Sequence, residues 1–265
     1  MGTTPDAARD EPTPTPKTDE SQSLEAQTWR LYGGDLADGA PLRDLILASW
    51  QRSAAAGLAR RATPVFRRLA EATLESTLRA NAELLDVARP HLEWVSAYLA
   101  GVDHVVFLAD RHGVVLYSIG DLAQQQLLCL SPGYDWSERS VGTNGAGTAI
   151  AAGRPVAVIG AEHFCTELAG WTCTAAPVRR DGEVIGAIDI STSNEEATPD
   201  RLALVAHVAF VIERELALQH AAREREILRE MSARKQRFIA ALAHELRRPL
   251  SAVMAAAEAL QRPAA

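Results

Sequence analysis

The chain has 265 residues, 47% of them hydrophobic, with three cysteines and a formal net charge of -7. This length suits one or two domains, and the acidic balance gives no electrostatic footprint for nucleic acid, so we expect no nucleic-acid partner. Three irregularly spaced cysteines do not form a disulfide framework and favour a reducing compartment. No apolar run reaches the roughly 18 residues that could span a bilayer, and the N-terminus has no signal-peptide pattern. We therefore expect a cytoplasmic protein with no membrane association.

The first third of the chain divides into a polar tail and a helical part. Residues 1–27 are rich in Pro, Thr and acidic residues, and this composition predicts a disordered tail because it can bury little apolar surface. An N-terminal helical segment is expected over 28–75. Apolar residues three and four apart in "PLRDLILASWQRSAAAGL" and in the stretch 69–101 indicate helices.

The pattern changes to strands after residue 101. "HVVFLADRHGVVLYSIG" contains two short β-branched runs around an Asp-Arg-His-Gly turn, and "APVRRDGEVIGAIDIST" repeats that design around Asp181 and Gly182, so each predicts a β-hairpin. Between them, "NGAGTAIAAG" predicts a short helix closed by Gly153, and "RPVAVIG" a strand. This order predicts an α+β domain over 76–197, in which helices flank one antiparallel sheet.

Glycines in the middle of this domain raise the possibility of a phosphate-binding loop. Gly142 and Gly147 have the required spacing, but Thr148 occupies the position of the expected lysine. A tight turn followed by a helix start is the better interpretation.

Three segments, "SWQRSAAAGL", "PGYDWSERSVGTNGAGTAIAAGRPVAVIGAEHF" and "CTAAPVRRDGEVIGAIDIS", together resemble the GAF sensory domain of acetoin-catabolism-type transcriptional activators. The resemblance covers about residues 41–193. It implies a small-molecule site in which the sheet is the floor and loops and short helices are the roof. Aromatic and polar residues within 136–144 and 163–173 are candidates for this site: Trp136, Ser137, Glu138, Asn144, His163, Phe164, Cys165, Trp171 and Cys173. The alternative is that the aromatic residues close the core and that His163 is a hydrogen-bonded loop residue.

Cys165 and Cys173, with His163 close by, raise the possibility of a metal or redox site. Their separation is not the short spacing of zinc ligands, and Cys129 lies outside the cluster, so we expect no metal. Buried thiols are favoured, and a thiol redox switch remains an alternative.

A long helix is expected after the sensory domain. Thr198 can cap it, Pro199 suits its first position, and no further Pro or Gly appears until Pro249. We expect a signalling helix and coiled-coil linker over 198–231. Alternating steps of three and four relate the residues of a predicted dimer seam, which are Leu228, Met231, Lys235, Phe238, Leu242 and Glu245. A solvated connector is the alternative, because the surrounding sequence is strongly charged.

The last segment, 232–265, contains "FIAALAHELRRPLSAV". A zinc HExxH motif is excluded, because Arg248 occupies the position of the second histidine. The stretch resembles the H-box of sensor histidine kinases. This resemblance implies that His244 is the phosphoacceptor and that Glu245 orients its ring or assists proton transfer. It also implies the first helix of a dimerisation and phosphoacceptor hairpin.

The sequence as a whole predicts the sensory part of a cytoplasmic two-component sensor histidine kinase that acts as a homodimer. A small molecule bound to the GAF domain would control ATP-dependent phosphorylation of His244 and transfer to a response-regulator aspartate. No cofactor is expected in this chain: ATP and Mg are implied only for a catalytic domain that it lacks, so the chain alone should be inactive. Two alternatives stay open, a non-enzymatic GAF regulator of transcription and a phosphorelay adaptor phosphorylated in trans.

Overall fold

A computed structural model describes residues 43–60 and 63–260, which divide into two compact units after Glu213. The predicted tail and the start of the predicted helical segment lie outside the described residues. The helices that follow are α2 (Asp44–Ala55), α3 (Glu71–Ala80) and α4 (Ala82–Tyr98). Between α2 and α3 the described residues form no helix, and Arg68 instead makes an isolated β-bridge with Tyr134. The helical part is therefore interrupted by an extended segment.

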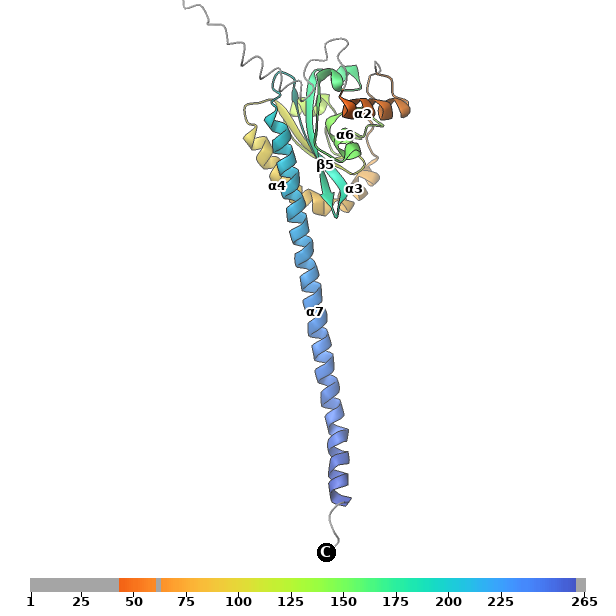
Figure 1. The fold of residues 1–265 in the computed structure, drawn as a ribbon, viewed down its shortest axis with the longest axis vertical. Helices are drawn as coiled ribbons and strands as arrows, with labels where there is room; N and C mark the ends of the chain where they lie inside the picture. The colour runs from red at the N-terminus through yellow and green to blue at the C-terminus, as the bar shows by residue number, and fades with distance from the viewer. Residues whose placement is uncertain (1–42, 61–62, 261–265) are drawn as a thin grey trace, which may run out of the picture. The chain divides into compact units, whose positions relative to one another are not determined.

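One five-stranded antiparallel sheet forms the centre of the first unit, with the strand order β2-β1-β5-β4-β3 (Figure 1). The first hairpin consists of β1 (His104–Asp110) and β2 (Val115–Gly120). The second consists of β4 (Trp171–Arg180) and β5 (Glu183–Ser193), and β3 (Val156–Ile159) pairs with β4. Both predicted hairpins and the predicted strand are confirmed, and so is the α+β class.

Local chemistry explains the turns around this sheet. Asp181 and Gly182 both have positive φ, 53° and 85°, as a tight two-residue hairpin turn requires. Helix α6 (Gly145–Ala152) ends at Gly153, whose φ of 62° is the left-handed conformation that favours glycine. The sequence did not predict the short helix α5 (Leu122–Leu127), since six residues are too few for a helical period to emerge. Asp121 caps this helix by accepting a hydrogen bond from the Gln124 amide.

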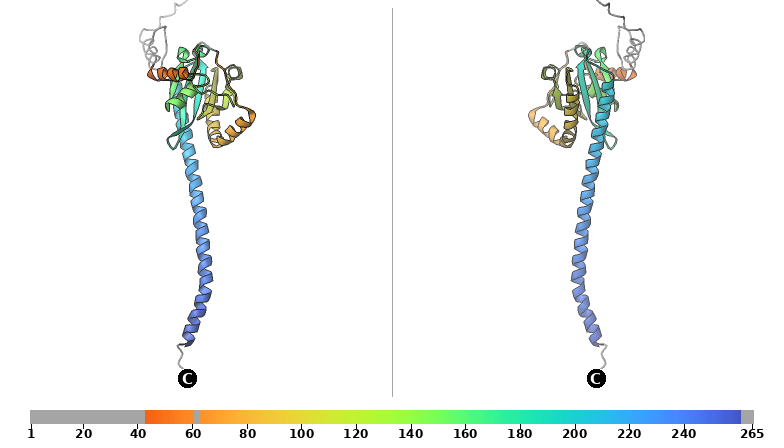
Figure 2. Two further views of the ribbon diagram at one scale, coloured as in Figure 1. Left: turned by 90° about the vertical axis from the view of Figure 1, so that its right-hand side faces the viewer. Right: turned by 90° about the vertical axis from the view of Figure 1, so that its left-hand side faces the viewer.

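The two faces of the sheet have different coverings, which Figure 2 shows from opposite sides. Alternate residues of β1 point to opposite faces, and Val105 and Phe107 face the same side as α6, where they join the main core. On the other face α4 packs against β1 and β2. The Arg179 amide of β4 donates to the Glu213 side chain of helix α7 (Asp200–Leu260), at 2.7 Å. Trp136 and Phe164, which lie in the loops of the predicted site, belong to the same core as α6, so these loops lie on the α6 face of the sheet.

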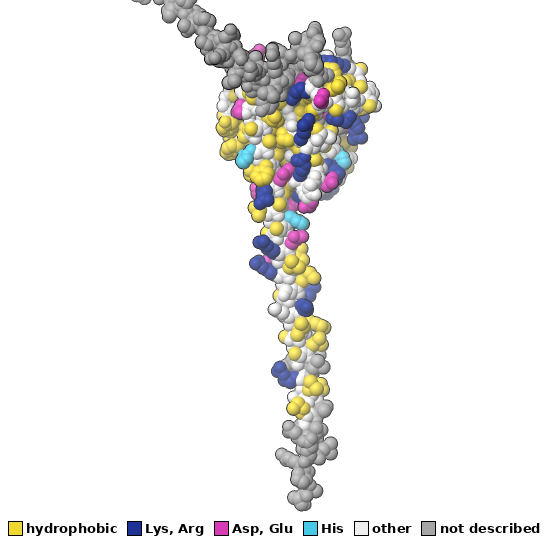
Figure 3. Space-filling model, in the orientation of Figure 1, with side chains coloured by type: hydrophobic (Ala, Val, Ile, Leu, Met, Phe, Trp, Pro, Cys, Tyr) yellow, Lys and Arg dark blue, Asp and Glu magenta, His cyan; other side chains and the backbone are white. Residues whose placement is uncertain are grey.

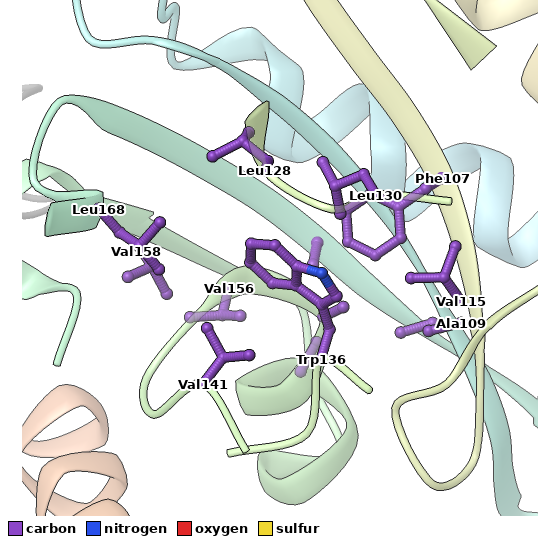
Figure 4. Close-up of a cluster of buried hydrophobic side chains, with 14 of the residues drawn as sticks. Phe107, Ala109, Val115, Leu128, Leu130, Trp136, Val141, Val156, Val158 and Leu168 are labelled. Carbon is purple, nitrogen blue, oxygen red and sulfur yellow. The ribbon is translucent and has the colours of Figure 1, made fainter. Parts of the chain in front are cut away.

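The core on the α6 face is built around Trp136, whose side chain is only 2% exposed (Figure 4). Phe107 and Phe66 flank its ring, with centroids 6.1 and 5.4 Å away. The indole nitrogen donates to the Cys129 carbonyl at 3.2 Å. A buried indole with its N–H satisfied contributes both apolar burial and a fixed orientation, and here it fills the centre of the domain.

Helix α7 contains 61 residues and confirms the predicted long helix. It begins at Asp200, one residue later than the predicted first position, and continues past Pro249. Apolar side chains recur along its described part and are visible in yellow in Figure 3. Leu228, Met231 and Phe238 of the predicted seam are 64%, 63% and 63% exposed in the single chain. Among the described residues, no helix is both long and apolar enough to cross a membrane.

Candidate functional site

The loop that precedes α6 is fixed by Asn144, which is fully buried. Its side-chain oxygen accepts from the Gly147 amide at 2.8 Å and so caps α6, while its nitrogen donates to the carbonyls of Trp136 and Gly142 at 2.9 and 2.7 Å. Gly147 is required here, because a Cβ at this position would lie 2.7 Å from the Trp136 carbonyl oxygen. One amide side chain therefore joins the helix start to the loop of Trp136, Ser137 and Glu138.

Glu138 connects this loop to α2. Its carboxylate is 7% exposed and accepts two hydrogen bonds from Arg52, with N–O distances of 2.6 and 2.9 Å. Ser49 donates to the same carboxylate at 2.5 Å. The hydrogen bonds from Arg52 to Glu138 raise the pKa of the guanidinium. Glu138 is thus held as a paired, hydrogen-bonded carboxylate under α2.

A second arginine–glutamate pair holds the start of α2. Arg43 donates two hydrogen bonds to the buried Glu162, with N–O distances of 2.8 and 2.5 Å. Burial raises the pKa of Glu162 despite the opposing effect of Arg43. Between the two pairs, the Trp50 indole donates to the Glu162 carbonyl at 2.7 Å, and the Arg60 guanidinium lies 3.7 Å from its ring centroid. Hydrogen bonds therefore hold the N-terminal end of α2 to the segment after β3 and its C-terminal end to the loop between α5 and α6.

His163 and Cys173 meet in a buried polar chain. The His163 Nε2 atom lies 3.4 Å from the Cys173 sulfur, which lies 3.3 Å from the Ser191 hydroxyl, and this hydroxyl donates to Asp189 at 2.8 Å. The other ring nitrogen of His163 lies 3.0 Å from the Gly160 carbonyl oxygen. Asp189 also accepts from the Ala146 amide at the start of α6. The chain thus runs from the loop after β3 to the N-terminus of α6.

Burial controls the protonation of this chain. Desolvation lowers the pKa of His163 to about 4 and raises the pKa of Asp189 to about 7. It also raises the pKa of the Cys173 thiol far above its usual range. At neutral pH the pair is a neutral imidazole beside a neutral thiol, so it does not provide the thiolate that nucleophilic or redox chemistry requires.

The remaining predicted residues pack into the interior or at its margin. Phe164 is 6% exposed and meets Trp50 edge-on at 6.1 Å, and Cys165 donates to the Val141 carbonyl at 3.2 Å. Trp171 is half-buried at the start of β4 and packs against the core. All three cysteines are free thiols. Within the described ranges, no group of three or more His, Cys, Asp or Glu residues could hold a metal ion.

A pocket of about 260 Å³ opens beside the loop that contains Ser137 and Glu138. Of the nine residues predicted from the sequence, Ser137 and Glu138 line it, together with Arg52, Arg111 and Arg139. These arginines were not predicted from the sequence, and neither were the buried polar residues Ser49, Glu162, Asp189 and Ser191. Arg52 and Arg43 pair with glutamates that lie 86 and 119 positions away, so no local spacing marks these two pairs.

His244 and Glu245 belong to α7, and their side chains lie outside the described part of the structure. The structure therefore places the predicted phosphoacceptor on a helix and does not describe its contacts. The nine residues of the predicted GAF site belong to the first compact unit, and His244 belongs to the second.

Comparison with protein families gives two matches. The GAF domain model matches residues 70–216, more than half of the chain, and the His Kinase A (phospho-acceptor) domain model matches residues 234–265. The chain belongs to the GAF domain family. The second match includes His244, so both resemblances predicted from the sequence are confirmed, and together they define a signalling protein.

Individual relatives are regulators. The acetoin dehydrogenase operon transcriptional activator AcoR of Bacillus subtilis is 32% identical over 213 residues, covering 78% of this chain and 35% of the relative. A signal-transduction and transcriptional-control protein of Clostridium beijerinckii is 34% identical over 146 residues, covering 54% and 23%. The chain thus spans about a third or less of the length of these two relatives. Among solved structures, the Escherichia coli DhaR(N)–DhaL complex contains a chain with a TM-score of 0.67 and 25% identity, covering 72% of this chain and 66% of that one.

Proposed function

We propose that this chain is the sensory part of a cytoplasmic two-component sensor histidine kinase. The observation that carries the proposal is the continuity of α7, a single helix that includes the end of the GAF match and all but the last few residues of the His Kinase A match. A change in the GAF domain that rotates or shifts this helix would act directly on the segment that contains His244. Ligand binding can control His244 only if its affinity differs between two arrangements of the helix.

The phosphoacceptor is His244. A neutral imidazole is a competent nucleophile near neutral pH, and the adjacent carboxylate of Glu245 can orient the ring or take up its proton. The phosphoryl donor, ATP with Mg, would be bound by a catalytic domain outside residues 1–265. The phosphoryl group would then pass to an aspartate of a response regulator.

Dimerisation is the arrangement that would bury the exposed stripe of α7. The His Kinase A match indicates a dimer. Leu228, Met231 and Phe238 are each more than half exposed in one chain, and leaving such a stripe in water is unfavourable. We propose a homodimer in which these residues pair with their copies.

The GAF domain would sense a small molecule near the loops at 136–144 and 163–173. Support for this location comes from Ser137 and Glu138, which line the pocket beside α6. Asn144 and Glu138 connect the 136–144 loop to α6 and α2 by hydrogen bonds, so a ligand at this loop would affect the packing of both helices.

A phosphorylation assay tests the proposal. The chain is joined to a histidine-kinase catalytic domain, incubated with labelled ATP, and compared with the His244→Gln variant. We expect label on the wild type and none on the variant, with acid-labile and base-stable chemistry typical of phosphohistidine. Equal labelling of the variant would refute the assignment of His244. His220→Gln is a matched control, because it removes an exposed histidine from the same helix and should leave the labelling unchanged.

The names of the relatives favour one second candidate. AcoR and the propane 2-monooxygenase operon activator MimR of Mycolicibacterium smegmatis, which is 29% identical over 161 residues, are both transcriptional activators. The chain could accordingly be a GAF ligand-binding regulator of transcription without kinase activity. The other alternative is a phosphorelay adaptor that is phosphorylated in trans. The same assay separates the adaptor from the transcriptional regulator, because phosphorylation of the adaptor requires His244 and the regulator is not phosphorylated there.

A further inference from the structure

We infer that the pocket beside α6 binds the anionic group of a small metabolite, a carboxylate or a phosphate. The pocket has a volume of about 260 Å³ and lies between α2, the β1–β2 turn, the loop after Trp136 and the outer side of α6. Its role as a sensory site rests on the proposed function, whereas its binding chemistry does not. Of the residues that line this pocket, only Ser137 and Glu138 were predicted from the sequence to bind a ligand.

The charge of the lining points to an anion. Three arginines from separate segments line the pocket: Arg52, Arg111 and Arg139. The single acidic residue in the lining, Glu138, is already paired with Arg52 and hydrogen-bonded to Ser49. No ion pair joins Arg111 or Arg139 to another described residue, and both are exposed. The pocket therefore has two positive charges without internal partners.

The neighbouring aspartates do not cancel this charge by pairing with the arginines. Asp110 accepts hydrogen bonds from the amides of His112 and Val114, at 2.8 and 2.9 Å. Asp135 accepts from the Ser137 amide at 2.9 Å. Both carboxylates are thus engaged in fixing the two loops that bear Arg111 and Arg139.

The floor of the pocket is pre-formed by close backbone contacts. A Cβ at Gly113 would lie 2.6 Å from the Ser137 nitrogen, and one at Gly147 would lie 2.7 Å from the Trp136 carbonyl oxygen. The glycines let the β1–β2 turn and α6 approach the same loop, which fixes the spacing of the pocket walls. The Ser137 hydroxyl in this wall is buried and has no hydrogen-bond partner among the described residues.

Size and chemistry define the ligand class. A volume of about 260 Å³ is just below the range of roughly 300–1,000 Å³ typical of drug-sized ligands, so the pocket suits a small metabolite. The planar fork of an arginine matches the two oxygens of a carboxylate or a phosphate. Ile150 and Ala151 of α6 provide an apolar wall for the uncharged part of the molecule.

The test uses the whole 265-residue chain and two probes, succinate for carboxylates and inorganic phosphate for phosphates, at constant ionic strength. Calorimetric titration measures affinity, and the melting temperature provides a second readout because a ligand of the folded state raises it. The variant is Arg111→Gln with Arg139→Gln. The matched control is Arg79→Gln with Arg214→Gln, which removes the same charge from exposed sites on α3 and α7.

We expect at least one probe to bind the wild type, about ten-fold weaker binding to the pocket variant, and unchanged binding to the control. The probe that binds more tightly identifies the preferred group. Absence of binding by both probes, unchanged affinity in the pocket variant, or an equal loss in the control would each overturn the inference. Because no ATP enters this experiment, its failure is separate from a failure of His244 phosphorylation.

Discussion

Replacing Asn144 with alanine should destabilise the first unit far more than the loss of an ordinary helix cap. The cap itself contributes about 1 kcal/mol. The side-chain nitrogen also donates to two carbonyls, those of Trp136 and Gly142, and a buried polar group left without its partner costs about 1–3 kcal/mol. The expected loss of unfolding free energy is therefore about 3–7 kcal/mol.

Urea unfolding followed by tryptophan fluorescence measures this loss. With a urea dependence near 2 kcal/mol per molar, the midpoint should fall by on the order of 2 M. Asp121→Ala is the matched control, because it removes a cap from α5 with a single hydrogen bond and should cost only about 1 kcal/mol.

Asn144→Asp separates the two roles of the side chain. An aspartate can still cap α6, but it offers no donor to the two carbonyls, and its charge lies at the same helix start as Asp189. We expect it to be at least as destabilising as the alanine variant. If either Asn144 variant lost no more unfolding free energy than Asp121→Ala, the proposed stabilisation of the loop by hydrogen bonds from the amide nitrogen would be refuted.

Two further predictions concern pH and signal transmission. The pKa of Asp189 in the folded state, about 7, lies above its unfolded value of about 4, so its contribution makes stability fall as pH rises between these values. The pKa of His163, about 4, lies below its unfolded value of about 6.5, so its contribution makes stability rise over that interval, and the two nearly cancel. Melting temperatures between pH 4.5 and 6.5 should therefore climb with pH in Asp189→Asn and decline in His163→Gln; parallel profiles for both variants would contradict the assigned shifts. Deleting one residue near Ala222 should rotate the helix downstream by about 100° and abolish or invert the ligand response of the kinase fusion, whereas deleting seven should largely preserve it. An intact response in both deletions would show that α7 is a passive tether.

The sequence by itself determined the elements whose signals are local. The turn at Asp181 and Gly182, the closing Gly153 and the period-two runs of the strands depend on neighbouring residues, and the structure has them as predicted. The long helix was equally predictable, because a long stretch of helix-forming residues without an internal Gly or Pro until Pro249 favours one continuous helix. The two motif resemblances are likewise properties of short segments, and the family matches confirm them.

Only the tertiary structure decided what the side chains of the predicted site contact. Trp136 and Phe164 pack inward, Glu138 pairs with Arg52 of α2, and Cys173 joins His163 to the Ser191 hydroxyl. These hydrogen bonds form between segments that are distant in the sequence and that only the fold brings together. No local pattern of residues predicts which of these segments will be in contact. The arginine-lined pocket likewise depends on tertiary structure. No sequence pattern marks Arg52, Arg111 and Arg139, and they line one pocket only because the fold places α2 next to the loops that contain the other two arginines.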